Sequence, residues 1–244
     1  MAKAARTVPL SMETLAVHGQ TVPFSVRINP RARRVIIKVD PVERAVILVI
    51  PRPSDLTHAL DFVTRQEGWI AARLAESPKG TPFVPGASVP LRGRMLTITS
   101  TPALHSRSIR PDMATGRLLV GGSGQEVTNR VAQWLKGLAR FDLADRVKDH
   151  AQTLNVRPLR LTVRDTRTRW GSCSSEGALS FSWRLIMAPP EVLDYVAAHE
   201  VAHLVHHDHS PAFWAVVRDL HGDPGGASAW LKREGAALHR YGAL

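Results

Sequence analysis

The sequence is poor in cysteine, in long apolar runs and in acidic residues. Cys173 is the only cysteine among 244 residues, so no internal disulfide can form and a disulfide-stapled secreted scaffold is excluded. Apolar runs such as Ala45–Ile50 are far shorter than the ~20 residues that span a bilayer, and the N-terminus has no apolar stretch of signal-peptide length. We therefore expect a cytoplasmic protein that does not contact a membrane.

The shortage of acidic residues gives the chain a formal net charge of +11, most of it in the first half. Residues 1–125 contain 17 basic and 8 acidic residues, whereas residues 126–244 contain 15 and 13. A basic field attracts nucleic acid, but this half has only four aromatic residues for base stacking. On a strand, Arg34 and Lys38 would point to one face and Arg33 to the other, which divides the charge. We expect weak, sequence-independent nucleic-acid binding at most.

Hydrophobic spacing predicts an α+β fold in which a strand-rich N-terminal part precedes a more helical one. In the first part, Val- and Ile-rich segments predict strands over 21–28, 33–40, 45–50, 95–99 and 116–120. A single helix is expected there over 55–74, because its apolar residues recur at helical spacing. The second part has predicted strands over 159–165, 167–173 and 178–185 and helices over 128–154, 190–206, 211–221 and 227–240. We place the domain boundary between residues 125 and 126.

Five of the eleven histidines lie between His199 and His209. His199 and His203 are four residues apart, so on a helix their side chains share one face and can hold one zinc ion. Glu200 follows the first histidine, and its carboxylate can act as general base on a metal-bound water. This H-E-x-x-H pattern indicates a hydrolytic zinc site; the alternative is a histidine-rich, solvated helix end.

A hydrolytic zinc site needs a third protein ligand and leaves the fourth position to water. His206 is on the same helical stripe, but it lies about 10.5 Å along the axis from His199. Ser210-Pro211 predicts the N-cap and first residue of a new helix. Because a residue before proline avoids the α region, the first helix should end between residues 206 and 208. His209 then lies at the bend, free to point back at the metal, and is our preferred third ligand.

Two other zincin arrangements fit less well. A metzincin has the same histidine spacing, but here His206 replaces its glycine and no methionine follows Met187. A thermolysin-like site would take a downstream glutamate, and Glu234 is the only one after Glu200. Glu234 is more simply explained as a surface charge.

Six short blocks follow one another at a distinctive spacing in the second half of the chain. They are Arg169-Trp170-Gly171-Ser172-Cys173-Ser174, Trp183-Arg184-Leu185, Pro189-Pro190, Asp194-Tyr195-Val196, His199-Glu200-Val201-Ala202-His203-Leu204 and His209-Ser210-Pro211-Ala212-Phe213-Trp214. In order and spacing they resemble the YgjP-like zinc metallopeptidase family, a relative of the SprT group. The strand-rich first half also resembles that family's N-terminal part.

The resemblance implies a compact zincin-type catalytic domain, which we place in residues 126–244. It implies one zinc ion held by His199, His203 and His209, with Glu200 as the base, and it does not supply a natural substrate. The extra pair His206-His207 departs from the family's pattern and leaves open whether either histidine contributes to the site.

Five other residues have both a functional and a structural interpretation. Tyr195, one turn before His199, could donate a hydrogen bond to a developing oxyanion or simply pack in the core. Arg169 and Trp170, on the strand before the turn, could contact a peptide that pairs with this strand, or be solvated and core residues respectively. Cys173 is better explained as a small buried residue than as a ligand. Asp208 could orient a ligand imidazole or be a solvated loop acid.

We therefore expect a zinc-dependent hydrolase, most simply a metallopeptidase with a peptide or protein substrate. One alternative is a zinc-dependent hydrolase of nucleotide phosphoanhydrides, although Gly121–Gly124 lacks the lysine of a phosphate-binding P-loop. Another is a nucleic-acid-associated protein with a structural zinc site. Structural zinc sites usually have four protein ligands and are often rich in cysteine. This chain has a single cysteine.

Overall fold

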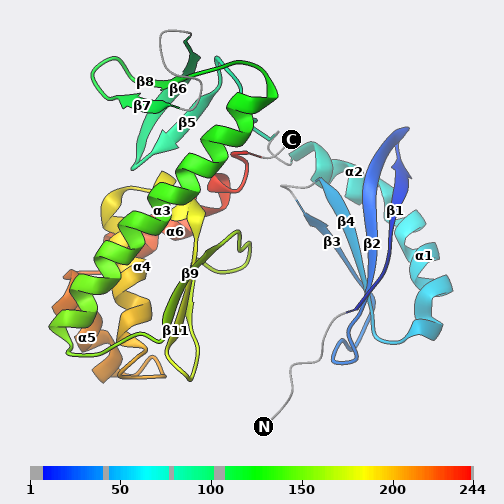
Figure 1. Cartoon of the computed structure of the whole chain (residues 1–244). Coiled ribbons are helices and arrows are strands. Elements are labelled where there is room, and N and C mark those ends of the chain that lie inside the picture. The colour runs from blue at the N-terminus through cyan, green and yellow to red at the C-terminus, as the bar shows by residue number, and fades with distance from the viewer. Residues whose placement is uncertain (1–7, 41–43, 77–79, 102–107, 243–244) are drawn as a thin grey trace. The chain divides into compact units, whose positions relative to one another are not determined.

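The chain folds into two compact units in the computed structural model, which describes residues 8–40, 44–76, 80–101 and 108–242 (Figure 1). The first unit ends at Gly80 and the second runs from Thr81 to Gly242. Each unit has its own cluster of buried apolar side chains. The predicted α+β class is confirmed. The division differs from the expected boundary after residue 125, which falls inside the second unit.

The first unit is a four-stranded sheet with two helices. The strands are β1 (Val8–Val17), β2 (Gln20–Ile28), β3 (Ile36–Asp40) and β4 (Ala45–Ile50), in the order β1-β2-β4-β3. The pair β2–β4 is parallel and the other two pairs are antiparallel. Alternate residues of β2 and β4 pack with the apolar side chains of α1 (Leu56–Arg65) and α2 (Glu67–Glu76).

Three details of this unit differ from the sequence prediction. Strand β1 has no counterpart among the predicted strands. The single helix expected over 55–74 is two helices, because the backbone of Gln66 (φ −99°, ψ 11°) leaves the helical range. Arg33 and Arg34, expected on a strand, precede β3, because a turn occupies this segment. In it, Asn29 Oδ1 accepts a hydrogen bond from the Arg31 N–H (3.1 Å).

The second unit begins with another four-stranded sheet, which shares its core with a long helix. Its strands are β5 (Ser88–Leu91), β6 (Arg94–Ser100), β7 (Ile109–Asp112) and β8 (Arg117–Val120), in the order β5-β6-β8-β7. Buried residues of β5, β6 and β8 belong to the same cluster as those along α3 (Gln125–Thr153). This common core explains why the chain does not divide at residue 125.

A three-stranded sheet lies next in the sequence and carries an edge strand that matters for the site. The strands are β9 (Arg160–Arg164), β10 (Gly171–Cys173) and β11 (Ala178–Ser182), in the order β10-β11-β9. Strands β10 and β11 are antiparallel, and β11 and β9 are parallel. Both β10 and β11 are shorter than the strands expected over 167–173 and 178–185.

Local hydrogen bonds explain these shorter strands. Before β10, the Thr166 hydroxyl donates to the Arg169 carbonyl (2.8 Å) and closes a loop, so Arg169 and Trp170 precede the strand. After β11, the Ser182 side chain accepts from the Arg184 N–H and caps a 3₁₀ helix over Trp183–Met187.

Three helices complete the unit: α4 (Pro190–Ala202), α5 (Pro211–His221) and α6 (Gly225–Leu238). Helix α4 ends earlier than the predicted residues 206–208. The residues after Ala202 form turns instead, in which the amides of Val205 and His206 both donate to the Ala202 carbonyl (3.0 Å each). The chain then enters α5 through Ser210, whose side chain accepts from the Phe213 N–H as expected of an N-cap. No helix in the described ranges has the length and apolar character needed to cross a membrane.

Candidate metal centre

Three histidine side chains meet where α4 ends and the following loop returns. His199 lies on α4, His203 caps its C-terminal end, and His209 comes from the loop before α5. One ring nitrogen from each lies within 4.8 Å of the others. The Nε2 atoms of His199 and His209 are 3.2 Å apart. Two nitrogen ligands of a tetrahedral zinc ion lie about 3.4 Å apart, so this donor set and its spacing fit zinc.

Hydrogen bonding within the cluster also fits a metal site. His203 Nδ1 lies 2.9 Å from the His206 carbonyl oxygen, which leaves Nε2 to face the other histidines. His199 Nδ1 is buried and has no hydrogen-bond partner among the described residues, so the ring's polar contact is with His209. Burial lowers the pKa of His199 to about 4, with the neighbouring His203 and His209 adding to the effect. At neutral pH this ring is uncharged, which is the form that binds a metal.

The ring of Phe213, on α5, packs against all three histidines of the cluster. Its fully buried ring lies 4.9 Å from the ring centre of His199, 4.5 Å from that of His203 and 4.9 Å from that of His209. Helix α5 therefore supports all three imidazoles through this one aromatic ring. Phe213 belongs to one of the family blocks, but its sequence position alone indicates no role for it.

Glu200 lies on the α4 face that meets strand β10. Its carboxylate is buried, and the Cys173 backbone N–H donates a hydrogen bond to it. Burial raises the pKa of Glu200 to about 7, although the positive charge of Arg169 and the Cys173 N–H oppose this shift. At position 171 a β-carbon would stand 2.5 Å from Glu200 Oε1, so only glycine leaves room for this side chain.

The histidines and Glu200 open into one cavity of about 340 Å³. Its lining residues are Arg169, Gly171, Ser172, Cys173, His199, Glu200, His203, His207 and His209. The cavity therefore combines the three-histidine cluster, one carboxylate, one guanidinium and the edge strand β10. Such a site can bind a metal, accept a proton and take up an extended chain.

Of the predicted substrate contacts, Arg169 alone lines this cavity. Trp170 turns away and packs in the core, where its ring would meet a β-carbon at Gly235 and lies 5.3 Å from the ring of His239. Tyr195 is buried, and its ring centre lies 5.9 Å from that of His199 in an edge-to-face arrangement. Its hydroxyl has a hydrogen bond with Ser228.

Four further residues considered from the sequence differ in how they relate to this cavity. His206 contributes its backbone carbonyl rather than its ring, whereas His207 lines the cavity. Asp208 accepts from the Ser210 N–H (3.1 Å). Glu234 forms a surface ion pair with Arg233 (2.8 Å) and is absent from the lining of the cavity.

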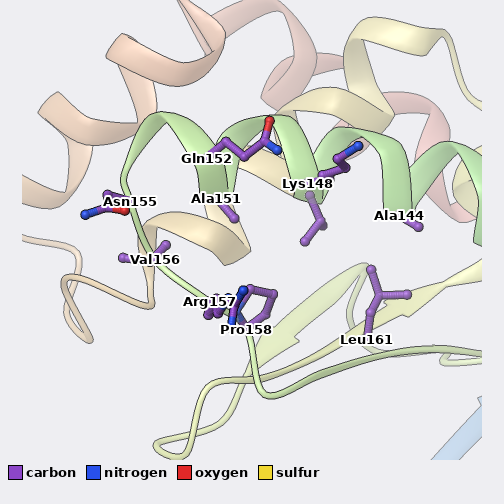
Figure 2. Close-up of a pocket in the computed structure, with 10 residues that line it drawn as sticks. Ala144, Lys148, Ala151, Gln152, Asn155, Val156, Arg157, Pro158 and Leu161 are labelled. Carbon is purple, nitrogen blue, oxygen red and sulfur yellow. The ribbon is translucent and has the colours of Figure 1, made fainter.

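A larger hollow, of about 650 Å³, lies elsewhere in the second unit. It is bounded by the C-terminal half of α3 and the segment that leads into β9 (Figure 2). Figure 2 shows Ala144 and Ala151 on the helix across from Pro158 and Leu161. None of its ten lining residues is a histidine, cysteine or carboxylate. The larger hollow therefore lacks the side chains that bind a metal or act as a base, and the smaller cavity beside the histidine cluster contains them.

Comparisons with known proteins agree with the chemistry of the cluster. A family model described as "YgjP-like, metallopeptidase domain" matches residues 33–234. No curated protein matches the sequence. Among solved structures, "Crystal structure of the metallopeptidase zymogen of Pyrococcus abyssi abylysin" is similar over 41% of this chain and 97% of that chain. Its sequence is 20% identical to this chain, and the TM-score is 0.35. Because the family match spans well over half of its length, the chain belongs to the YgjP-like metallopeptidase family.

Proposed function

We propose that this protein is a zinc-dependent metallopeptidase whose centre is the cluster of His199, His203 and His209. The observation that carries the proposal is the convergence of three imidazoles and one buried carboxylate on a single cavity. One zinc ion per chain would bind these three nitrogens and leave one coordination position open. When bound, zinc supplies Lewis-acid chemistry, which polarises a carbonyl group and lowers the pKa of water.

Glu200 is the general base of the proposed reaction. Its carboxylate lies in the same cavity as the three histidines, where it accepts a proton from the attacking water. The same carboxyl group then gives the proton to the leaving amine. Its pKa of about 7, raised by burial, suits a group that must both take up and release a proton near neutral pH.

Strand β10 is the proposed docking edge for the substrate chain. The Trp170 carbonyl accepts from Ser182 (2.9 Å), and the Ser174 N–H donates to Ala178 (3.0 Å), so the backbone groups at these two positions face β11 and its flanks. Because successive residues of a strand alternate, the backbone groups of Gly171 and Cys173 face the opposite side. The Cys173 N–H already donates to Glu200. An extended peptide can therefore add to this edge by main-chain hydrogen bonds to the Gly171 groups and the Cys173 carbonyl.

The test is peptide cleavage that depends on the metal. The purified chain is stripped with a chelator, reloaded with one equivalent of zinc, and incubated with a mixed peptide library that is analysed by mass spectrometry. We expect cleavage products with the reloaded protein and none with the stripped protein. Equal cleavage by the two preparations, or no cleavage by either, would contradict the proposal.

A further inference from the structure

We propose that the cavity beside the histidine cluster contains a carboxylate-binding subsite formed by Arg169, so that preferred substrates present a carboxylate close to the scissile bond. This inference rests on the proposed peptidase activity and names the substrate class for the same site. The carboxylate could belong to an Asp or Glu side chain or to the free C-terminus of the substrate. Both sources would present the same carboxylate group to Arg169.

The composition of the cavity favours an anionic group over an apolar one. None of its nine lining residues is a large apolar side chain, whereas pockets that take apolar groups are lined mainly by such residues. The only carboxylate in the lining is Glu200, and Arg169 is the only arginine or lysine. A zinc ion on neutral imidazoles would add further positive charge. The cavity therefore attracts anions.

Arg169 is available to bind such a group. Its side chain is exposed, and it has no carboxylate within ion-pair distance among the residues that the structure describes. Its positive charge acts on Glu200 through space, without an ion pair. A guanidinium group can bind a carboxylate through two parallel hydrogen bonds, which provides geometric selectivity as well as binding energy.

The backbone holds Arg169 where a docked peptide would pass. Its carbonyl oxygen accepts from the Thr166 hydroxyl (2.8 Å), and the next carbonyl, that of Trp170, accepts from the Ser182 N–H (2.9 Å). These bonds fix the backbone of Arg169 just before β10. A substrate strand added to β10 runs past this point, so the guanidinium lies beside the chain and near the histidine cluster.

The experiment compares three peptides of one sequence with the zinc-loaded protein. The first has blocked ends and a central Glu, the second has blocked ends and Gln instead, and the third has Gln and a free C-terminal carboxylate. The value of kcat/KM is measured for wild type, Arg169→Gln, Arg169→Glu and the control Arg160→Glu. Arg160 is exposed on β9, at the opposite edge of the same sheet. Binding of the same peptides to zinc-loaded Glu200→Gln protein, with and without Arg169→Gln, is followed by fluorescence anisotropy.

For the wild type we expect at least one carboxylate peptide to exceed the blocked Gln peptide by roughly tenfold to hundredfold in kcat/KM. Which of the two does so identifies the source of the carboxylate. The preference should disappear in Arg169→Gln, turn against carboxylates in Arg169→Glu and persist in Arg160→Glu. Equal rates for the three peptides, or a preference that survives Arg169→Gln, would overturn the subsite.

Absence of any cleavage would count against the proposed peptidase function, and the binding measurements then decide the subsite alone. Tighter binding of a carboxylate peptide that is lost with Arg169→Gln supports the subsite. Equal binding of all three peptides rejects it.

Discussion

Gly171 and Glu200 approach each other so closely that position 171 has no room for a side chain. A β-carbon there would lie 2.5 Å from Glu200 Oε1 and 2.6 Å from its Cγ. Because the contact involves Cγ as well as the carboxylate, the whole Glu200 side chain would have to move. The edge strand β10 thus sets the position of the proposed general base.

We therefore expect Gly171→Ala to keep zinc and to lose most of its peptidase activity. A displacement of about 1 Å at a reacting group can cost on the order of 10²-fold in rate. Zinc content by atomic absorption and kcat/KM on one peptide measure the two effects. The control is Gly137→Ala on α3, where a β-carbon meets nothing within 4 Å and alanine favours the helix. Full activity of Gly171→Ala would show that β10 does not position Glu200 for catalysis.

The third ligand can be tested by metal content alone. We expect His209→Ala to bind zinc far more weakly than wild type, because one of three nitrogens is lost from the cluster. Glu234→Ala should keep its zinc, since Glu234 pairs with Arg233 at the surface. Zinc retained by His209→Ala and lost from Glu234→Ala would replace the proposed site with a thermolysin-like one.

Asp194 joins three helices of the second unit. Its two carboxylate oxygens lie 2.9 Å from His150 Nε2 on α3 and 2.6 Å from His221 Nδ1 on α5. Burial by itself would raise the pKa of Asp194, but the hydrogen bonds and charges of the two histidines outweigh it and hold this pKa below its usual value. The carboxylate therefore stabilises the fold above the unfolded pKa of about 3.9, and this stabilisation is lost as the pH falls through the folded value.

We expect Asp194→Asn to lower the free energy of unfolding by roughly 3 kcal/mol at pH 7, and by less as the pH falls below about 4. Urea denaturation over a pH series measures both effects. Asp145→Asn is the control, because its carboxylate is half-exposed beside Arg146 and such pairs contribute about 0–1 kcal/mol. A loss for Asp194→Asn that does not change with pH would show that its charge is not what stabilises the helices.

The basic residues of the first half should bind nucleic acid weakly. Arg33 and Arg34 lie in a bend before β3 rather than on a strand, so the expected alternation of their side chains does not apply. Lys38 is on β3. We still predict sequence-independent binding through phosphate contacts, which weakens steeply with salt. A salt titration with labelled single- and double-stranded DNA tests this. Tight binding at physiological salt, or peptide hydrolysis that requires DNA, would contradict it.

Local patterns were sufficient to predict that His199, His203 and His209 come together, because the position of each depends on its own segment. The i, i+4 spacing places His199 and His203 on one helical face, and Ser210-Pro211 marks the break that returns His209 to them. The end of α4 was predicted too late. The turns after Ala202, and the contact between the His203 ring and the His206 carbonyl, are not encoded in helical periodicity.

Gly171 and Phe213, which sequence patterns did not single out, act through contacts between distant segments. Gly171 has a role only because Glu200, 29 positions later, packs against it. Phe213 has a role only because α5 folds back and places this ring against the three imidazoles. Both lie within the family blocks, which was the one available signal. The unit boundary was misplaced for a similar reason, since the core shared by β5–β8 and α3 is a tertiary property.

The most direct test of the account measures zinc and hydrolysis in the same samples of wild type and Glu200→Gln. Glu200 is assigned as the base rather than a ligand, so both proteins should hold one zinc ion per chain after reloading. Loss of a general base costs about 10²–10⁴-fold, and we expect kcat/KM of Glu200→Gln on a cleaved peptide to fall by this factor. A Glu200→Gln protein that contains one zinc ion and cleaves the peptide at the wild-type rate would contradict the mechanism.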